Sequence, residues 1–452
     1  MATPQLALRR PPSPFTRMAE ARARTDALFD LLPPASFYER PIPERHRPIF
    51  YLGHLEAFDW NLLHAALGLE SREPTFDQLF AFGIDPVGGG LPVDTPGDWP
   101  SLGQVEQYGR QVRALLDEQF PRSTDVSDPL LADGTLLQVA IEHRLMHAET
   151  LAYLIHNLAL EKRRGLPGPT ADFRPAPKQR QATISVGTAT LGRSRGAGWL
   201  GWDNEFERQQ IIVPEFSIDV FPVTNAQYLK FVQAGGYEDA RYWKPEDWDW
   251  RSRERLEHPH FWILRSGSRA TDRDTRWGHR AMFGTIPLPA AWPVYVSHAE
   301  ASAFACWAGK KLPSEAQWHR AAYGTPIGGE RMYPWGDAPW GDAEPERARG
   351  NFHHGHWDPT PVDAHLAGSS AFGVCDLVGN GWEWTSTPFA PLPGFEPLPY
   401  YRGYSAAFFD GKHFVLKGGS SRTDACMLRR SFRNWFQPRY PYVYAKFRCV
   451  EE

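Results

Sequence analysis

Residues 128–160 read DPLLADGTLLQVAIEHRLMHAETLAYLIHNLAL and give the clearest indication of the N-terminal fold. Apolar residues recur in them at steps of three and four, which predicts an amphipathic helix interrupted near Asp133-Gly134. His143 and His147 are four residues apart, so a helix places both imidazoles on one face, one turn apart. Two imidazoles in that arrangement can bind one metal ion. The same stretch therefore predicts both a helix and a metal site.

Three earlier segments have the same helical periodicity: residues 15–32, 48–67 and 101–120, the last with Ser101 as its N-cap. Four amphipathic helices joined by one long connection predict a four-helix bundle, which we place at residues 15–165. The connection, GIDPVGGGLPVDTPGDWP at 83–100, is rich in glycine and proline and is predicted to contain no helix. Loops of that length within a compact domain are often functional.

A third imidazole for the metal site is predicted to come from His54, on the second helix, in an apolar run that should face the bundle core. Three histidines from two facing helices form the kind of inward site that bundles build. Neutral imidazoles suit Zn, Fe, Ni or Cu, and three of them leave open positions for a substrate or oxygen.

Two alternatives to this metal site stay open on sequence grounds. The three histidines can be ordinary partly buried residues, or the metal can bind at NFHHGHWD, which contains His353, His354 and His356. The second motif lies in a loop-rich region and has no evident ligand from another element. His64 is not in phase with the predicted site, and Glu149 cannot share the helix face of His147.

A charged, proline-rich stretch predicts an interdomain linker at residues 166–182. From 183 to 452 short β-type runs, such as 182–192 and 209–224, alternate with long irregular loops. Helices are predicted only at 225–235 and in the region 297–324. The whole chain is therefore predicted to be α+β, with a helical bundle followed by a mixed domain.

Composition excludes several classes of protein. The formal net charge of -4 argues against a dedicated nucleic-acid binder, and no stretch approaches the ~20 apolar residues of a membrane helix. The four cysteines are scattered without CxxC spacing, so we predict no disulfide framework and a cytoplasmic location. The expected partners are therefore small molecules.

Several motifs resemble those of known proteins. HRLMHAE at 143–149, with His54 in an early helix, resembles the HxxxHxE signature of the sulfoxide synthases of ergothioneine and ovothiol biosynthesis, which have a DinB-like bundle. The second domain resembles the formylglycine-generating-enzyme fold, a variant of the C-type lectin architecture. The motifs that carry this likeness are FPVTNAQY (221–228), KLPSEAQWHRAA (311–322), YPWGD (333–337), DLVGNGWEWT (376–385), LKGGSSR (416–422) and the segment 431–449. Together the two resemblances cover almost the whole chain.

The resemblance implies a mononuclear non-haem iron enzyme that uses Fe(II), O₂ and N-α-trimethylhistidine (hercynine), with His54, His143 and His147 as metal ligands. It also implies that Asn434 binds the hercynine carboxylate and that Trp435 meets the trimethylammonium group, which suits an aromatic face. In the family an active-site tyrosine acts near the iron, and the matching segment LPYYRGYS offers Tyr400 and Tyr401. Tyr400 and Tyr401 are therefore expected to be catalytic, unless both are packing aromatics. Asn434, Trp435, Phe436 and Tyr440 are expected to bind substrate.

Arg433 is expected to form a structural ion pair rather than to contact substrate. The cysteines that support formylglycine generation have no counterpart in a matched motif, so the resemblance does not imply sulfatase activation.

The chain departs from relatives that use γ-glutamylcysteine. Phe436 stands where they have an acidic residue, Tyr440 falls in their arginine-rich stretch, and the loop 83–100 contains no Arg or Lys. An anionic co-substrate would need fixed cations. Aromatics and carboxylates such as Asp85, Asp94 and Asp98 instead suit a sugar.

These departures favour the sister branch, selenoneine synthase, which takes a selenosugar as chalcogen donor. The alternative is an ergothioneine-type sulfoxide synthase that joins cysteine or γ-glutamylcysteine to hercynine. Further rivals are a metal-dependent thiol transferase, against which the lectin-like domain argues, and a binding module, against which the complete histidine set argues.

Overall fold

The structure is a computed structural model that describes residues 13–81, 91–120, 128–165, 168, 171–196, 201–265, 276–338 and 348–452. The chain divides into two compact units, residues 1–164 and 165–452. The first is helical and the second combines helices with four small sheets, so the predicted α+β class is confirmed.

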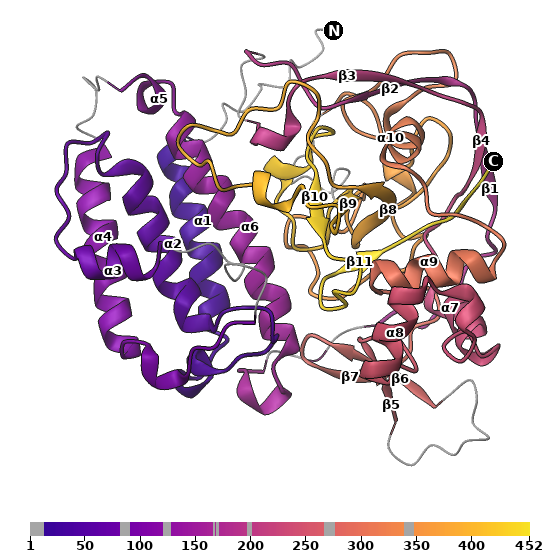
Figure 1. The fold of residues 1–452 in the computed structure, drawn as a ribbon, viewed down its shortest axis with the longest axis horizontal. Coiled ribbons are helices and arrows are strands. Elements are labelled where there is room, and N and C mark those ends of the chain that lie inside the picture. Colours follow the sequence, from indigo (N-terminus) through magenta and orange to yellow (C-terminus); the bar gives the residue numbers. More distant parts are fainter. Residues whose placement is uncertain are drawn as a thin grey trace, which may run out of the picture. The chain divides into compact units, whose positions relative to one another are not determined.

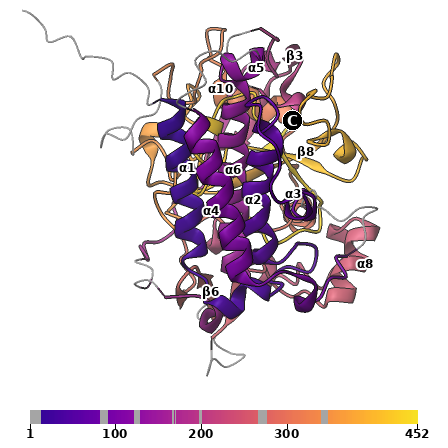
Figure 2. The same ribbon diagram turned by 90° about the vertical axis from the view of Figure 1, so that its left-hand side faces the viewer.

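Four long helices form the first unit and lie side by side (Figures 1 and 2). They are α1 (Pro14–Phe29), α2 (Pro48–Leu63), α4 (Leu102–Gln119) and α6 (Thr135–Asn157). Helix α2 packs against α4 and α6, and α1 packs against α6. The predicted four-helix bundle is confirmed, and a short additional helix, α3 (Pro74–Leu79), follows α2.

Two helix boundaries predicted from local sequence patterns are found in the structure. Ser101 caps α4 through a reciprocal pair of hydrogen bonds with Gln104. The predicted break in the last segment separates α5 (Pro129–Ala132) from α6 at Gly134, whose φ of 80° is a left-handed conformation that glycine adopts at little cost. Helix α6 is buried over most of its length, which explains its apolar composition on nearly every face.

A buried ion-pair network joins α2 to α6. The guanidinium of Arg144 donates to Glu56 at 2.9 Å, to Asp59 at 2.6 Å and to the backbone carbonyl of Leu55 at 3.0 Å. The side chains of Arg144 and Asp59 are fully buried, and Glu56 is nearly so. Burial favours a raised pKa for Glu56, but Arg144 and Arg113 outweigh it and hold that pKa well below its usual value. The network therefore fixes how far α6 slides and turns against α2.

The second unit contains the following elements: β1 (Gln181–Ile184), β2 (Gly187–Leu191), β3 (Gln209–Val213), β4 (Phe216–Asp219), α7 (Asn225–Gln233), α8 (Pro245–Glu254), β5 (Trp262–Leu264), β6 (Trp277–Ala281), β7 (Gly284–Pro287), α9 (His298–Trp307), α10 (Glu315–Tyr323), β8 (Trp382–Pro388), β9 (Phe414–Lys417), β10 (Asn434–Phe436), β11 (Ala445–Lys446) and β12 (Val450–Glu451). The predicted strand regions 182–192 and 209–224 contain β2, β3, β4 and all but the first residue of β1, and are confirmed.

The helix prediction for this unit was incomplete. Helix α8 was missed, because its sequence PEDWDWRSRE is mostly charged and buries only Asp247 and Trp250. The region 297–324 contains two helices, α9 and α10, rather than one continuous element. Gly309, with a φ of 69°, and Pro313 lie between them and prevent a single helix.

Strand β10 carries the predicted substrate residues and is held in a four-stranded sheet of order β10-β9-β8-β11. It pairs antiparallel with β9, so that Asn434 lies opposite Leu416 and Phe436 opposite Phe414. The other sheets have the orders β1-β4-β12, β2-β3 and β5-β6-β7. Buried ion pairs tie the C-terminal segment to β8, with Arg448 donating to Glu383 at 2.6 and 2.7 Å.

Within the described part of the chain, none of the helices combines the length and apolarity that a membrane crossing requires.

Replacing Arg144 by methionine is expected to destabilise the bundle by about 3–5 kcal/mol, because the buried Asp59 loses its ion-pair partner and Glu56 loses one of its two arginines. Chemical unfolding of the metal-free protein, followed by circular dichroism, measures the change. Arg113→Met is the matched control. Arg113 also binds Glu56, at 2.8 Å, but it is partly exposed, so this variant is expected to lose less stability than Arg144→Met. Equal losses in the two variants would contradict the role given to Arg144.

Candidate metal centre and aromatic site

The three predicted histidines meet inside the bundle. His54 lies on α2, and His143 and His147 lie one turn apart on α6; one ring nitrogen from each falls within 4.8 Å of the others. Nε2 of His143 is 3.1 Å from Nε2 of His147. Nδ1 of His54 lies 2.7 Å from the carbonyl oxygen of Phe80. Because a carbonyl only accepts, Nδ1 of His54 carries the proton and Nε2 keeps its lone pair for a ligand.

Burial keeps these imidazoles neutral. It lowers the pKa of His54 to about 4, and it lowers the pKa values of His143 and His147 well below the ordinary histidine value. Aromatic rings line the cluster: Phe50 stacks on His54 with centroids 5.0 Å apart, and Phe58 stacks on His143 at 3.4 Å. Neutral imidazoles with converging lone pairs are the donor set that a borderline divalent metal prefers. The triad can therefore hold such an ion.

The competing histidine motif at 353–356 offers a less complete set of metal ligands. His353 Nδ1 lies 3.1 Å from a carboxylate oxygen of Asp424, and His354 Nε2 lies 3.8 Å from the same oxygen. Among the described residues, the only set of three side chains that meets the geometry of a metal site is the His54 cluster. His64 donates to the carbonyl of Leu69 at 3.1 Å at the end of α2, which is a structural contact.

Trp435, in the second unit, is the centre of an aromatic cluster. Phe389 stacks parallel to its indole at 4.3 Å, Tyr404 meets it edge-on at 5.4 Å, and Phe408 lies at 5.5 Å. The side chain of Trp435 remains half-buried. Tyr404 was not predicted as a site residue, although it lies three residues after Tyr401 in the segment that was singled out.

The neighbours of Trp435 have defined contacts of their own. Asn434 accepts a hydrogen bond from the backbone N–H of Trp435 at 2.9 Å. Phe436 stacks parallel to Tyr440 at 5.4 Å, so these two predicted substrate residues pack together. Arg433 forms a two-pronged ion pair with Glu315 at 3.0 and 3.1 Å, as predicted for a structural residue.

Tyr400 and Tyr401, predicted as candidate catalytic residues, are both half-buried. Tyr401 lies 5.7 Å from Tyr404 and 6.2 Å from Trp202, measured between ring centroids. The tyrosine segment therefore belongs to the same aromatic region of the second unit as Trp435.

The loop carboxylates Asp94 and Asp98, predicted to suit a sugar, both have hydrogen-bond partners within the protein. Asp94 accepts from Arg40 at 2.6 Å and from Arg47 at 2.9 Å, so two arginines from outside the loop neutralise it. Asp98 caps a short 3₁₀ turn at 96–98, which also corrects the prediction that the loop contains no helix. Asp85 lies outside the described residues.

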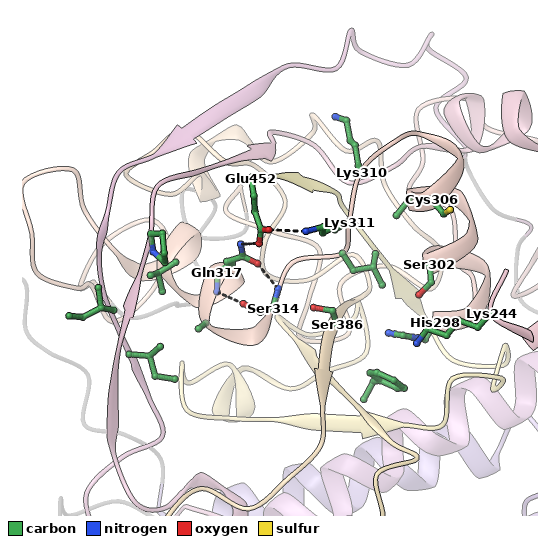
Figure 3. A pocket seen from close by; sticks show the side chains of 18 residues that line it. Lys244, His298, Ser302, Cys306, Lys310, Lys311, Ser314, Gln317, Ser386 and Glu452 are labelled. Atoms are coloured by element: carbon green, nitrogen blue, oxygen red, sulfur yellow. Dashed lines mark hydrogen bonds and ion pairs between the residues drawn. The ribbon is translucent and has the colours of Figure 1, made fainter. Parts of the chain in front are cut away.

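A cavity of about 610 Å³ in the second unit lies apart from the predicted residues (Figure 3). None of the predicted site residues lines it, although Phe414, the cross-strand neighbour of Phe436, does. Two of its three lysines are in ion pairs: Lys310 pairs with Asp219 at 2.8 Å and Lys311 with Glu452 at 2.9 Å.

Comparison with known proteins assigns the two units to domain families that occur together in one protein family. Residues 17–151 match the DinB superfamily and residues 169–452 match the sulfatase-modifying factor enzyme 1-like domain. The hercynine oxygenase of Mycolicibacterium smegmatis is 35% identical over 80% of this chain and 79% of its own length. The chain belongs to the hercynine oxygenase family.

Two further relatives are similar over smaller shares of their own length. The hercynine oxygenase of Mycobacterium tuberculosis is 41% identical over 55% of each chain. Ergothioneine biosynthesis protein 1 of Neurospora crassa is 27% identical over 93% of this chain and 56% of its own. The expected resemblance to hercynine-using sulfoxide synthases is thus confirmed at the level of the family.

The four cysteines, all within the described residues, form no disulfide.

His143→Ala is expected to reduce metal affinity by more than the ~10–100-fold that loss of an outer hydrogen-bond partner costs, because a direct ligand is removed. Metal content after anaerobic loading with Fe(II) and desalting measures this loss, and circular dichroism checks the fold. His64→Ala, a histidine of the same bundle outside the cluster, should bind metal normally. Full metal content in the His143 variant would contradict the assignment of the centre.

Proposed function

We propose that the chain is a selenoneine synthase, an Fe(II)- and O₂-dependent enzyme that joins the selenium of a selenosugar to C2 of hercynine. The observation that carries the proposal is the buried cluster of three neutral imidazoles, His54, His143 and His147, in a member of the hercynine oxygenase family. In the balanced reaction, the C2–H and Se–H bonds are lost, and C2–Se and Se=O bonds form. O₂ is reduced to the oxide of the product and one water.

The bundle would hold Fe(II), which when bound supplies the capacity to reduce O₂ and open positions for ligands. The contribution of the chain is orientation and exclusion of water. The Phe80 carbonyl fixes the ring of His54, and Arg144 fixes the register of the helix that carries the other two histidines. Phe50 and Phe58 cover the imidazoles with apolar surface.

The aromatic cluster around Trp435 would bind the trimethylammonium group of hercynine. A quaternary ammonium has no hydrogen to donate, so aromatic faces are its natural partners in a protein. The ring centroids of Tyr404 and Phe408 lie 5.4 and 5.5 Å from the indole of Trp435, so three aromatic rings gather at this position. Asn434 would donate its side-chain N–H to the hercynine carboxylate, because its oxygen already accepts from Trp435. Tyr400 or Tyr401 would supply a proton as a neutral phenol.

The choice of a selenosugar over a charged thiol rests on the ion pairs that the arginines near Asn434 already form. Arg433 is bound to Glu315, Arg429 donates to Glu205 at 2.5 and 2.9 Å, and Arg430 pairs with Glu330 at 3.3 Å, so the three arginines at 429–433 have carboxylate partners. Phe436 and Tyr440 stack on each other at positions where the resemblance to γ-glutamylcysteine-using enzymes implies an acidic residue and an arginine-rich stretch. γ-Glutamylcysteine carries two carboxylates that would need cations, whereas a sugar needs only hydroxyl partners.

The alternative within the family is an ergothioneine-type synthase that uses cysteine or γ-glutamylcysteine. Arg40 and Arg47, which lie against the loop carboxylate Asp94, are the described cations that favour this alternative. A metal-dependent thiol transferase with zinc is a third candidate; it would need no O₂.

A competition assay decides among these donors. Protein loaded anaerobically with Fe(II) receives hercynine, air and equal amounts of a selenosugar, cysteine and γ-glutamylcysteine, and mass spectrometry identifies the products. A selenium-bearing hercynine adduct is expected as the main product, because Arg429, Arg430 and Arg433 are each bound to a carboxylate. A main product that contains sulfur would return the protein to the ergothioneine branch. Turnover without O₂, or with zinc alone, would favour the transferase.

Trp435→Ala is expected to weaken hercynine binding by roughly 1–2 kcal/mol, about 5- to 30-fold, as for a desolvated cation–π contact. Calorimetric titration of the protein with hercynine under anaerobic conditions measures the affinity. Trp307→Ala is the control, because Trp307 packs against Phe231 and Phe304 away from the Trp435 cluster. Unchanged affinity in the Trp435 variant would remove this residue from the hercynine site.

A further inference from the structure

Lys244 is the lysine of the 610 Å³ cavity that stays outside any ion pair with the described residues. Its ammonium group lies 5.5 Å from the ring centroid of Phe414, which also lines the cavity. The charge of Lys244 acts on the carboxylate of Asp247, but that carboxylate is bound to Arg439 at 2.8 Å. A cavity with an uncompensated cation in its wall favours an anionic ligand.

A buried imidazole lies beside this lysine. His298 is 3% exposed, lines the cavity and stacks on Phe414 with ring centroids 3.8 Å apart. Nε2 of His298 lies 3.1 Å from the carbonyl oxygen of Thr385, and because a carbonyl only accepts, Nε2 carries the proton. Nδ1 therefore keeps its lone pair, and it has no hydrogen-bond partner among the described residues. The cavity thus offers a hydrogen-bond acceptor next to a cation.

The electrostatics keep His298 an acceptor. Burial and the charge of Lys244 lower the pKa of His298 to about 3, although the hydrogen bond to Thr385 opposes the shift. The imidazole is therefore neutral at neutral pH, and its Nδ1 can accept a proton-bearing group but cannot donate.

Two serine hydroxyls lie next to the imidazole. Ser302 follows His298 by one helical turn on α9, so the two side chains share a face of that helix. Ser386 directly follows Thr385 on β8, the residue whose carbonyl holds His298. Both serines line the cavity, and neither hydroxyl is hydrogen-bonded to another residue in the part of the chain that the structure describes.

The four polar groups match a tetrahedral oxyanion that retains one proton. Lys244 and the hydroxyls of Ser302 and Ser386 can donate, whereas Nδ1 of His298 can only accept. Hydrogen phosphate presents three unprotonated oxygens and one O–H group, which fits three donors and one acceptor. Sulfate and carboxylate ions carry no proton near neutral pH, so either would leave Nδ1 of His298 unpaired.

We infer that Lys244, His298, Ser302 and Ser386 form a binding site for a hydrogen phosphate group. The site goes beyond the proposed hercynine chemistry, because none of the proposed metal or substrate residues lines the cavity. It is a second ligand site, in the second unit, whose occupant is an anion.

The cavity has room for more than the phosphate group. Its volume of about 610 Å³ lies within the range of small-molecule sites, and much of the remaining wall is apolar, formed by Ile211, Val213, Leu312 and Ala316. The carboxylate in the wall, Glu452, is bound to Lys311 at 2.9 Å; Figure 3 shows this pair above and to the left of His298 and Lys244. The phosphate group is therefore either free inorganic phosphate or part of a small hydroxylated phosphate monoester.

Calorimetric titration of the metal-free full chain, slightly above neutral pH, tests the site with inorganic phosphate, sulfate and glycerol 3-phosphate. Metal-free protein prevents phosphate from binding to a metal ion at the His54 cluster. Phosphate is expected to bind at least ~10-fold more tightly than sulfate, because only phosphate has a proton for His298. Tighter binding of glycerol 3-phosphate than of phosphate would assign the site to a phosphorylated metabolite, and the reverse order would assign it to the free ion.

Lys244→Met should weaken phosphate binding at least ~10-fold, because a charge-assisted hydrogen bond is lost. Lys244 is exposed, so the variant should fold normally, which circular dichroism checks. Lys230→Met is the matched control: Lys230 is an exposed lysine on α7 that does not line the cavity, and its loss should change the affinity by less than about 2-fold.

His298→Phe tests the acceptor. It keeps an aromatic ring against Phe414 but removes Nδ1, so the preference for phosphate over sulfate should fall to within about 3-fold. If this variant fails to fold, the wild-type preference and the Lys244 variant decide the question.

The inference is overturned if neither phosphate probe binds the wild-type chain, or if sulfate binds it as tightly as phosphate does. It is also overturned if Lys244→Met binds phosphate as wild type does, because the anion would then lie on another positive surface.

Discussion

The buried ion-pair network of Arg144 with Glu56 and Asp59 is the constraint on which the proposed metal centre depends. A metal site needs its ligands placed to within a fraction of an ångström, and apolar packing alone leaves helices freer to slide. Arg144 lies on α6 beside His143, and its two carboxylate partners follow His54 on α2. One buried cation therefore links the helix that supplies two imidazoles to the helix that supplies the third.

The sequence predicted the features that arise from local periodicity. The helical spacing of His143 and His147, the N-cap Ser101 and the break at Gly134 all follow from rules that act within a few residues. It did not predict the contacts that depend on chain segments far apart. The Phe80 carbonyl that orients His54 and the arginines that neutralise Asp94 come from distant positions, so no local pattern indicates them. Helix α8 was missed because tertiary contacts, rather than an apolar stripe, hold it.

The two units supply complementary chemistry. The bundle offers neutral nitrogen ligands whose pKa values are lowered by burial, which keeps their lone pairs available to a metal at neutral pH. The second unit offers aromatic rings around Trp435, with its nearby arginines bound to buried carboxylates. A surface of that kind recognises cations without donors and neutral hydroxyl groups better than it recognises anions.

Anomalous diffraction at the iron edge tests the central claim, that the three imidazoles form the metal centre, most directly. Crystals grown anaerobically with Fe(II) should show one strong anomalous peak, about 2.0–2.2 Å from a ring nitrogen of each of His54, His143 and His147. A peak beside His353 and Asp424, or no ordered iron between the helices, would contradict the account.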